Sequence, residues 1–124
     1  MKSNSYERYK RLIDSSQVYD VADISPISRA NLLSKKLKNE ILLKREDLQP
    51  IFSFKIRGAY NKLAKLKKSG FSGSVIAASA GNHAQGVAYG AKSLKLKALI
   101  VMPITTPAIK LSLIHISEPT RHCT

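Results

Sequence analysis

One stretch of the sequence decides the fold, residues 75–101, which read VIAASAGNHAQGVAYGAKSLKLKALIV. Short apolar runs at its two ends, 75–78 and 98–101, are typical of buried strands, and Pro103 ends the second. Between them lie a turn and a segment with apolar residues at helical spacing. Apolar strands that alternate with amphipathic helices predict βαβ units and a parallel sheet, so we expect an α/β fold.

The segment between the two runs predicts a helix with a small-residue face. That face consists of Ala84, Val87, Ala88 and Ala91. Two glycines, Gly86 and Gly90, leave the same helix thin on one side. We therefore expect another element to pack closely against it.

The sequence before this stretch predicts further helices and one more strand. Apolar residues at helical spacing predict a helix over 5–15 and, after Pro26, a second one over about 27–38 with Ala30, Leu33 and Leu37 on one face. The short run 41–43 is interpreted as a strand that also belongs to the alternating pattern.

A further helix is expected to start near Lys55 or Ile56 and to end at Ser69-Gly70, because glycine tolerates a left-handed cap. Its inward face would carry Tyr60, Leu63 and Ala64, with lysines outward.

The charge is strongly basic, with 21 Lys and Arg against 8 Asp and Glu and a net charge of +13. The lysines are spaced along amphipathic segments, and this distribution favours a solvated basic surface over a nucleic-acid partner. The single cysteine, Cys123, cannot form an internal disulfide. No apolar signal core follows Met1, and no run reaches the ~20 residues of a membrane span, so we expect a soluble cytoplasmic protein.

Two turns are candidates for chemistry, because ligands on parallel sheets sit at the carboxyl ends of strands beside helix N-termini. The first is Ser53-Phe54-Lys55. A lysine among apolar neighbours can lose hydration, which lowers its pKa and makes it a better nucleophile for a Schiff base. The alternative interpretation is an ordinary exposed lysine at a helix start.

The second turn, Ser79-Ala80-Gly81-Asn82-His83, opens a predicted helix. Free backbone N–H groups there would bind a carboxylate or phosphate, and Gly81 lets a ligand approach. The alternative is a capped helix start without a ligand. His83 has no ligand partner at metal spacing, so no metal site is expected. The charged run Arg45-Glu46-Asp47 is either a solvated loop or a source of ion pairs that order the Lys55 turn.

Taken together, these motifs resemble the biosynthetic threonine ammonia-lyases, which are fold-type II pyridoxal-phosphate (PLP) enzymes similar in fold to the tryptophan synthase β subunit. The resemblance runs from about Val18 to Lys110, through LKREDLQP at 43–50, SFKIRGAY at 53–60, ASAGNHAQG at 78–86, VMP at 101–103 and TTPAIK at 105–110. It implies a partial parallel sheet with helices on both faces.

The resemblance also implies roles. Lys55 would hold PLP covalently and move the substrate's α-proton, Phe54 and Asn82 would contact the cofactor, and Ser79, Ala80, Gly81, Asn82 and His83 would hold the substrate carboxylate. The reaction would convert L-threonine to 2-oxobutanoate and ammonia for isoleucine biosynthesis, in a homo-oligomer. Serine racemase and serine dehydratase share these patterns and stay open as alternatives, as does a small basic binding protein without catalysis.

The resemblance breaks after Lys110. The run LSLIHISEPTR at 111–121 resembles the conceptual translation of a transposase adapter used in sequencing libraries. We therefore expect residues 1–110 to be the N-terminal part of a catalytic domain and 111–124 to be a non-native tail. The glycine-rich loop that binds the PLP phosphate in the family is missing, so we expect the chain alone to be inactive.

Overall fold

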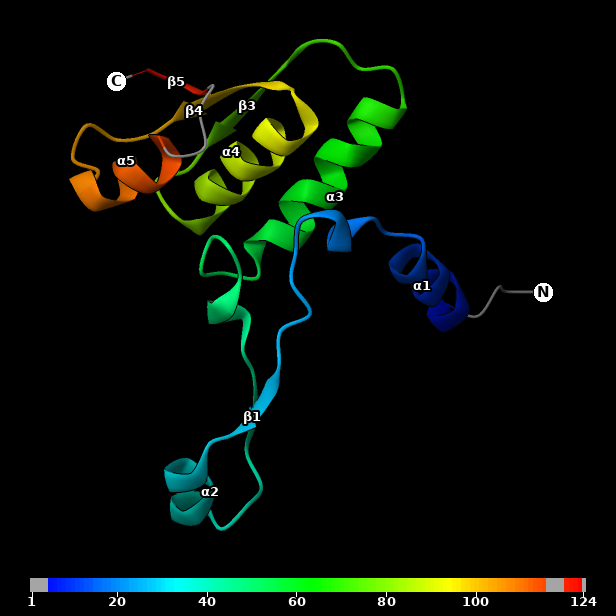
Figure 1. The fold of residues 1–124 in the computed structure, drawn as a ribbon, viewed down its shortest axis with the longest axis vertical. Coiled ribbons are helices and arrows are strands. Elements are labelled where there is room, and N and C mark those ends of the chain that lie inside the picture. The colour runs from blue at the N-terminus through cyan, green and yellow to red at the C-terminus, as the bar shows by residue number, and fades with distance from the viewer. Residues whose placement is uncertain (1–4, 116–119, 124) are drawn as a thin grey trace.

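The structure, a computed structural model, describes residues 5–115 and 120–123 (Figure 1). Its α-helices are α1 (Ser5–Asp14), α2 (Asn31–Leu37), α3 (Lys55–Lys68), α4 (Asn82–Leu94) and α5 (Ala108–His115). Its strands are β1 (Ile27–Arg29), β2 (Leu42–Lys44), β3 (Ser74–Ala78), β4 (Lys97–Val101) and β5 (Thr120–Cys123), and two short 3-10 helices are η1 (Val18–Asp20) and η2 (Glu46–Leu48).

The stretch that decides the fold forms the predicted β3–α4–β4 unit. Strands β3 and β4 pair in parallel, with Val75 beside Ala98 and Ala77 beside Ile100, and the sheet order is β3-β4-β5. These four side chains face the core beneath α4, where Ile100 is fully buried. The α/β interpretation and the parallel sheet are confirmed for this unit.

The other face of this sheet is open in the part of the chain that the structure describes. Ile76 is 69% exposed and Val101 is 40% exposed, because residues at alternate positions point away from α4. The expectation of a fully buried strand at 75–78 is therefore wrong. β3 also ends the sheet, so its outer edge has no described partner.

Helices α3 and α4 form the centre of the body and run in the same direction. A β-carbon on Gly86 would lie 3.1 Å from the Ala59 side chain, near the start of α3. One turn later, a β-carbon on Gly90 would lie 3.0 Å from the Leu63 side chain. The predicted thin side of α4 is thus confirmed, and the partner is α3. The predicted inward face of α3 (Tyr60, Leu63 and Ala64) is also buried.

The segment 27–44 departs from the prediction. Residues 27–29 form strand β1 rather than the start of a helix, because they pair antiparallel with β2, and α2 begins only at Asn31. Strand β2 consequently lies in a separate two-stranded sheet and not in the parallel one. The expected apolar face of α2 is exposed, with Leu33 at 43% and Leu37 at 56%.

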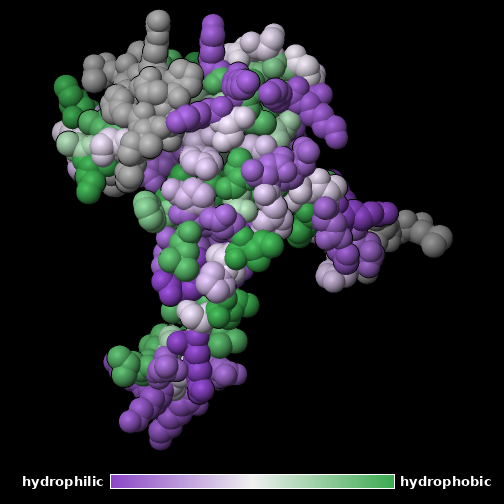
Figure 2. Space-filling view, in the orientation of Figure 1, coloured by the Kyte–Doolittle hydropathy of each residue, from purple (hydrophilic) through white to green (hydrophobic). Residues whose placement is uncertain are grey.

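The segment β1–α2–β2 forms an arm that extends away from the body (Figure 1). Hydrophobic residues gather where this arm joins the body (Figure 2). Among the large hydrophobic side chains of the joining segments, Ile24 is 82% exposed, Leu48 is 51% exposed and Phe52 is 68% exposed. The junction between the arm and the body therefore carries hydrophobic side chains that no other described residue covers.

The remaining helices agree with the sequence where it made a prediction. Helix α1 forms as expected but buries none of its residues. Helix α3 ends as expected beside Gly70, whose φ of 84° is the left-handed conformation that glycine adopts easily. Among the described residues, no helix is long and apolar enough to cross a lipid bilayer.

Candidate active site

Lys55 is the first residue of α3. Its backbone N–H donates to Ser53 Oγ at 3.3 Å, and its Nζ lies 5.3 Å from the centroid of the Phe54 ring. Both side chains are exposed, Phe54 at 59%, so the apolar enclosure expected around Lys55 is not formed by the described residues. Lys55 also makes no ion pair within the described part of the chain, and its amine is open to a ligand.

The second turn follows β3 directly. The Ser79 N–H donates to the Val101 carbonyl at 2.9 Å, and the Gly81 N–H donates to Ser79 Oγ at 3.3 Å. Gly81 is the N-cap of α4, and no side chain caps this helix. The helix start is therefore not capped by a side chain, and Asn82 is the first helical residue rather than a cap.

The open first turn of α4 has the character that the sequence predicted for an anion site. Its leading backbone N–H groups carry the positive end of the helix dipole and have no capping side chain. Asn82 and His83 are exposed, while Ser79, Ala80 and Gly81 are half-buried. His83 lines a groove of about 390 Å³ between α3 and β3 that it shares with Leu63 and Val87. Among the described residues, no group of His, Cys, Asp or Glu could hold a metal ion.

Helix packing brings the two turns to the same end of the molecule. A β-carbon on Gly86, one turn into α4, would lie 3.1 Å from the Lys55 carbonyl oxygen. Because α3 and α4 run in the same direction, both N-termini face the end where β3 stops. Only the Ser79–His83 turn follows a parallel strand, however, and the Lys55 turn arrives from η2 instead, which corrects the expectation for Ser53-Phe54-Lys55.

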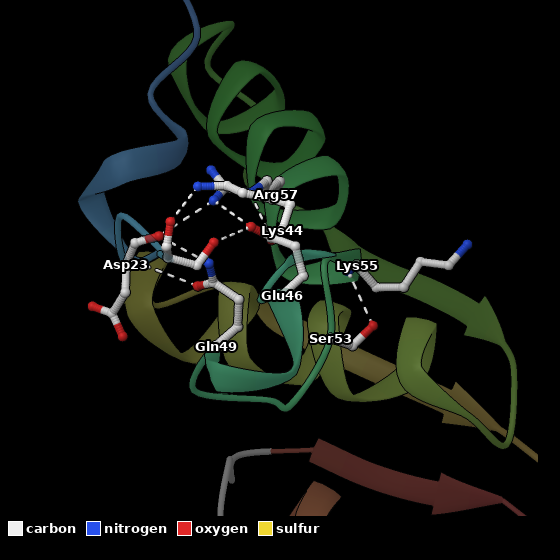
Figure 3. Close-up of polar contacts among 8 residues, drawn as sticks. Asp23, Lys44, Glu46, Gln49, Ser53, Lys55 and Arg57 are labelled. Carbon is white, nitrogen blue, oxygen red and sulfur yellow. Dashed lines mark hydrogen bonds and ion pairs between the residues drawn. The ribbon is translucent and has the colours of Figure 1, made fainter. Parts of the chain in front are cut away.

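An ion-pair network orders the chain that leads to Lys55 (Figure 3). Arg57 donates from Nε to Glu46 Oε2 at 2.8 Å and from Nη2 to Glu46 Oε1 at 2.9 Å. Ser25 Oγ donates to the same Oε1 at 2.5 Å. Of the two possibilities for the run Arg45-Glu46-Asp47, an ion pair toward the Lys55 turn is found for Glu46. Asp47 instead pairs with Arg45 on the surface.

Gln49 ties this network to the segment before the arm. Its side chain is almost fully buried, at 1% exposure, and it pairs with the backbone of Asp23 in both directions. The Asp23 N–H donates to Gln49 Oε1 at 2.9 Å, and Gln49 Nε2 donates to the Asp23 carbonyl at 2.8 Å. Lys44 Nζ also donates to the Ser25 carbonyl.

Sequence reasoning missed Arg57, Gln49 and Ser25. Their partners lie 11 to 34 residues away, and no local pattern marks them. A possible signal was the uncharged polar Gln49 immediately before Pro50 and the apolar Ile51. A buried amide has to satisfy all of its hydrogen bonds, so such a residue commonly binds backbone.

The electrostatics of the network follow from its geometry. The hydrogen bond from Arg57 lowers the pKa of Glu46 from 4.5 to about 2, even though partial burial acts in the opposite direction. The same contact raises the pKa of Arg57. Burial, and then a hydrogen bond to Asp20 at 3.0 Å, raises the pKa of Tyr60. Glu46 and Arg57 are therefore both charged at neutral pH.

Comparison with known proteins assigns the family. The model of the family described as "Pyridoxal-phosphate dependent enzyme" matches residues 20–117. This chain belongs to that family. The match reaches past Lys110, the last residue of the resemblance seen in the sequence.

Curated relatives in this family are threonine dehydratases. The chain is 56% identical over 110 residues to the mitochondrial threonine dehydratase of Saccharomyces cerevisiae, covering 89% of this chain and 19% of the relative. It is 59% identical over 102 residues to the chloroplastic biosynthetic threonine dehydratase 1 of Solanum lycopersicum, covering 82% and 17%. The chain thus spans about a fifth of the length of these relatives.

Solved structures of the family have the same fold. The processed form of threonine deaminase isoform 2 from Solanum lycopersicum matches with a TM-score of 0.83 and 44% identity, over 98% of this chain and 34% of that one. Maize serine racemase matches with a TM-score of 0.80 and 28% identity, over 86% and 32%.

The residues present fit the cofactor that gives the family its name. PLP needs a primary amine for covalent attachment and donors for its anionic groups. Lys55 supplies an amine without an ion-pair partner among the described residues, and α4 supplies an uncapped helix N-terminus at the same end of the body.

Proposed function

We propose that this chain forms part of a PLP-dependent ammonia-lyase that converts L-threonine to 2-oxobutanoate and ammonia, the entry reaction of isoleucine biosynthesis. The observation that carries the site is the close approach of the Lys55 backbone to Gly86, which brings the start of α3, with Lys55, and the uncapped start of α4 to one end of the body. Identity of 56% and 59% to threonine dehydratases supports threonine as the substrate.

The chain's own residues have three tasks in this proposal. Lys55 Nζ attaches the cofactor and, once released, takes the proton from the α-carbon of the substrate. The backbone N–H groups of the Ser79–His83 turn hold the substrate carboxylate. Asn82 orients the cofactor by a hydrogen bond to its ring hydroxyl, and Phe54 lies beside the attachment point. PLP, when bound, supplies the electron sink that stabilises the negative charge left at the α-carbon.

The overall conversion balances without any further reagent. Threonine loses its α-proton and its β-hydroxyl, which together leave as water. Water then replaces the amino group, which leaves as ammonia, and the carbon skeleton remains as 2-oxobutanoate.

The experiment expresses the longer protein that contains this segment and supplies PLP with either L-threonine or L-serine. The proposal expects 2-oxobutanoate from threonine at a rate on the order of 1 per second or faster. The second candidate, serine racemase or serine dehydratase activity, is favoured by the match to maize serine racemase. Formation of D-serine or pyruvate from serine with no turnover of threonine would replace the first proposal with the second.

We further propose that the 124-residue chain by itself does not turn over threonine. The described residues leave the Lys55 side chain exposed and one face of the parallel sheet open. Purified chain with PLP and threonine should release no 2-oxobutanoate above the level of free PLP.

Partners and location belong to the same proposal. We propose an amino-acid substrate, a homo-oligomeric longer protein, no nucleic-acid or membrane partner, and a cytoplasmic location. The yeast relative is named as a mitochondrial protein and the tomato relative as a chloroplastic one. Cell fractionation with an antibody to this segment is therefore the appropriate test of location.

A further inference from the structure

The start of α3 has little local support. Its N-cap is Phe54, no side chain caps it, and the Lys55 N–H has only the 3.3 Å contact to Ser53 Oγ. The Arg57 N–H donates to the Phe54 carbonyl at 3.1 Å, but a first turn without a side-chain cap frays more easily than a capped one. Something other than capping has to fix where Lys55 points.

Arg57 fixes the rotation of that helix start. Residues two positions apart in an α-helix lie about 200° apart around its axis. Lys55 and Arg57 accordingly leave α3 in opposite directions (Figure 3). Holding Arg57 on one side therefore aims Lys55 on the other side, while the Lys55–Gly86 contact fixes how close α3 lies to α4.

Arg57 is held by a bidentate ion pair and two further contacts. Besides its bonds to Glu46 at 2.8 and 2.9 Å, its Nη2 donates to the Asp23 carbonyl at 3.2 Å, and its guanidinium lies 5.2 Å from the centroid of the Tyr19 ring. A planar fork matched to a carboxylate restrains orientation as well as distance. Glu46 is in turn held by Ser25.

We propose that Glu46 is a positioning residue for Lys55, acting through Arg57 to set the rotation of the first turn of α3. This inference rests on the proposed role of Lys55 but is tested separately from it. Glu46 does not touch the substrate or the cofactor in this scheme. Its effect reaches Lys55 only through the backbone of residues 55–57.

The neighbouring ion pair provides a matched control. Arg45, the N-cap of η2, and Asp47, the residue after Glu46, form a bidentate pair of similar length, at 2.8 and 2.7 Å. That pair is exposed, with side chains at 37% and 58%, whereas Arg57 and Glu46 are at 23% and 17%. Glu46→Gln and Asp47→Asn remove the same charge, but only the first loosens α3.

The test measures amide hydrogen exchange in the 124-residue chain without cofactor or substrate, so its outcome does not depend on the threonine reaction. In Glu46→Gln, the amides of Arg57, Gly58 and Ala59 should exchange roughly tenfold faster, because a charged bidentate contact is lost. Amides of α4 from Val87 onward should be unchanged, and Asp47→Asn should match the parent chain. Equal exchange in the two variants would overturn the proposal.

A second readout separates positioning from simple support. Both variants are treated with PLP and borohydride, and labelling at Lys55 is compared with labelling at Lys62, which is exposed on the same helix. Glu46→Gln should lower the Lys55-to-Lys62 ratio at least about threefold, because orientation governs such reactions. An unchanged ratio would show that Glu46 supports the fold without positioning Lys55.

If Glu46→Gln does not fold, Arg57→Lys takes its place. Lysine keeps the positive charge but cannot form the bidentate contact with Glu46. Amide exchange at Gly58 and Ala59 should therefore be faster than in Asp47→Asn, but slower than if the ion pair were lost completely. Exchange no faster than in Asp47→Asn would equally overturn the proposal.

Discussion

The backbone of Lys55 touches the second turn of α4 at Gly86: a β-carbon at that glycine would stand 3.1 Å from the Lys55 carbonyl oxygen and 3.3 Å from its carbonyl carbon. Because Gly86 has no side chain, the backbone of the proposed reactive lysine can lie close to α4. The distance between the two helix N-termini is set by this contact.

We predict that Gly86→Ala destabilises the chain, although alanine is the better helix former. The added methyl meets the Lys55 carbonyl oxygen and the Ala59 β-carbon at 3.1 Å. Overpacking typically costs about 1–3 kcal/mol, which equals or exceeds the gain of ~1 kcal/mol in helix propensity. Gly58→Ala is the control, since nothing lies within 4 Å of a β-carbon there. Thermal melting should rank Gly58→Ala above the parent chain and Gly86→Ala below it. The reverse order would mean that α3 and α4 do not pack as described.

We predict that Lys55→Ala in the longer protein abolishes 2-oxobutanoate release from threonine, because one amine serves as both anchor and base. Lys62→Ala, which removes an exposed lysine from the same helix, should retain full turnover. Peptide mapping after treatment with PLP and borohydride should show the label at Lys55 in the parent protein. Near-normal turnover by Lys55→Ala would remove this residue from the site.

We predict that Asn82→Ala in the longer protein impairs turnover much more than stability. Asn82 is exposed and makes no capping bond, so the unfolding free energy should change by less than about 0.5 kcal/mol. Loss of a hydrogen bond to the cofactor should reduce kcat by roughly tenfold or more. Paired measurements of kcat and melting temperature decide this. A destabilised variant with full kcat would make Asn82 a structural residue.

The Glu46–Arg57 pair gives the fold a defined acid dependence. Because folding lowers the pKa of Glu46 from 4.5 to about 2, its contribution is complete above about pH 5 and is lost as the pH falls toward 2. Glu46→Gln should therefore cost on the order of 2 kcal/mol at neutral pH and progressively less below pH 4.5. Urea unfolding at several pH values measures this. A difference between parent and variant that does not depend on pH would contradict the assignment.

We predict that genomic DNA departs from this sequence after Lys110. The run from Leu111 still forms structure here: α5 continues to His115, Ile114 is fully buried, and β5 pairs with β4. An apolar run next to an open hydrophobic core packs against it whatever its origin. Amplifying the locus from an independent library gives the answer. A genomic reading frame that encodes LSLIHISEPTR at this junction would make the tail native.

The sequence predicted the β3–α4–β4 unit well because its signals are local. Apolar runs, the alanine face of α4 and the two glycines all lie within one continuous stretch. Prediction failed at 27–29, where Pro26 and the leucines suggested the start of a helix over about 27–38. These three residues pair with β2 instead, and such a pairing depends on residues 13 to 17 positions further along the chain.

The site shows the same division. Lys55 and the Ser79–His83 turn were singled out from their neighbours, but the expected enclosure of Lys55 was not found, because adjacent hydrophobic residues do not guarantee burial. The network of Glu46 and Arg57 was foreseen only as one of two possibilities. Its other members, Ser25, Gln49 and Asp23, lie far apart in the sequence, and no sequence pattern predicts that these segments come together.

The open sheet face has a consequence for how such a protein is made. β3, α4 and β4 are consecutive, so they assemble while a ribosome is still adding the residues that follow. During that interval the side bearing Ile76 stays bare, and the free edge of β3 offers itself to any neighbouring strand. A nascent chain with this exposed face and edge is therefore prone to aggregate once β3 has formed, and we expect the yield of soluble protein to rise when molecular chaperones are co-expressed.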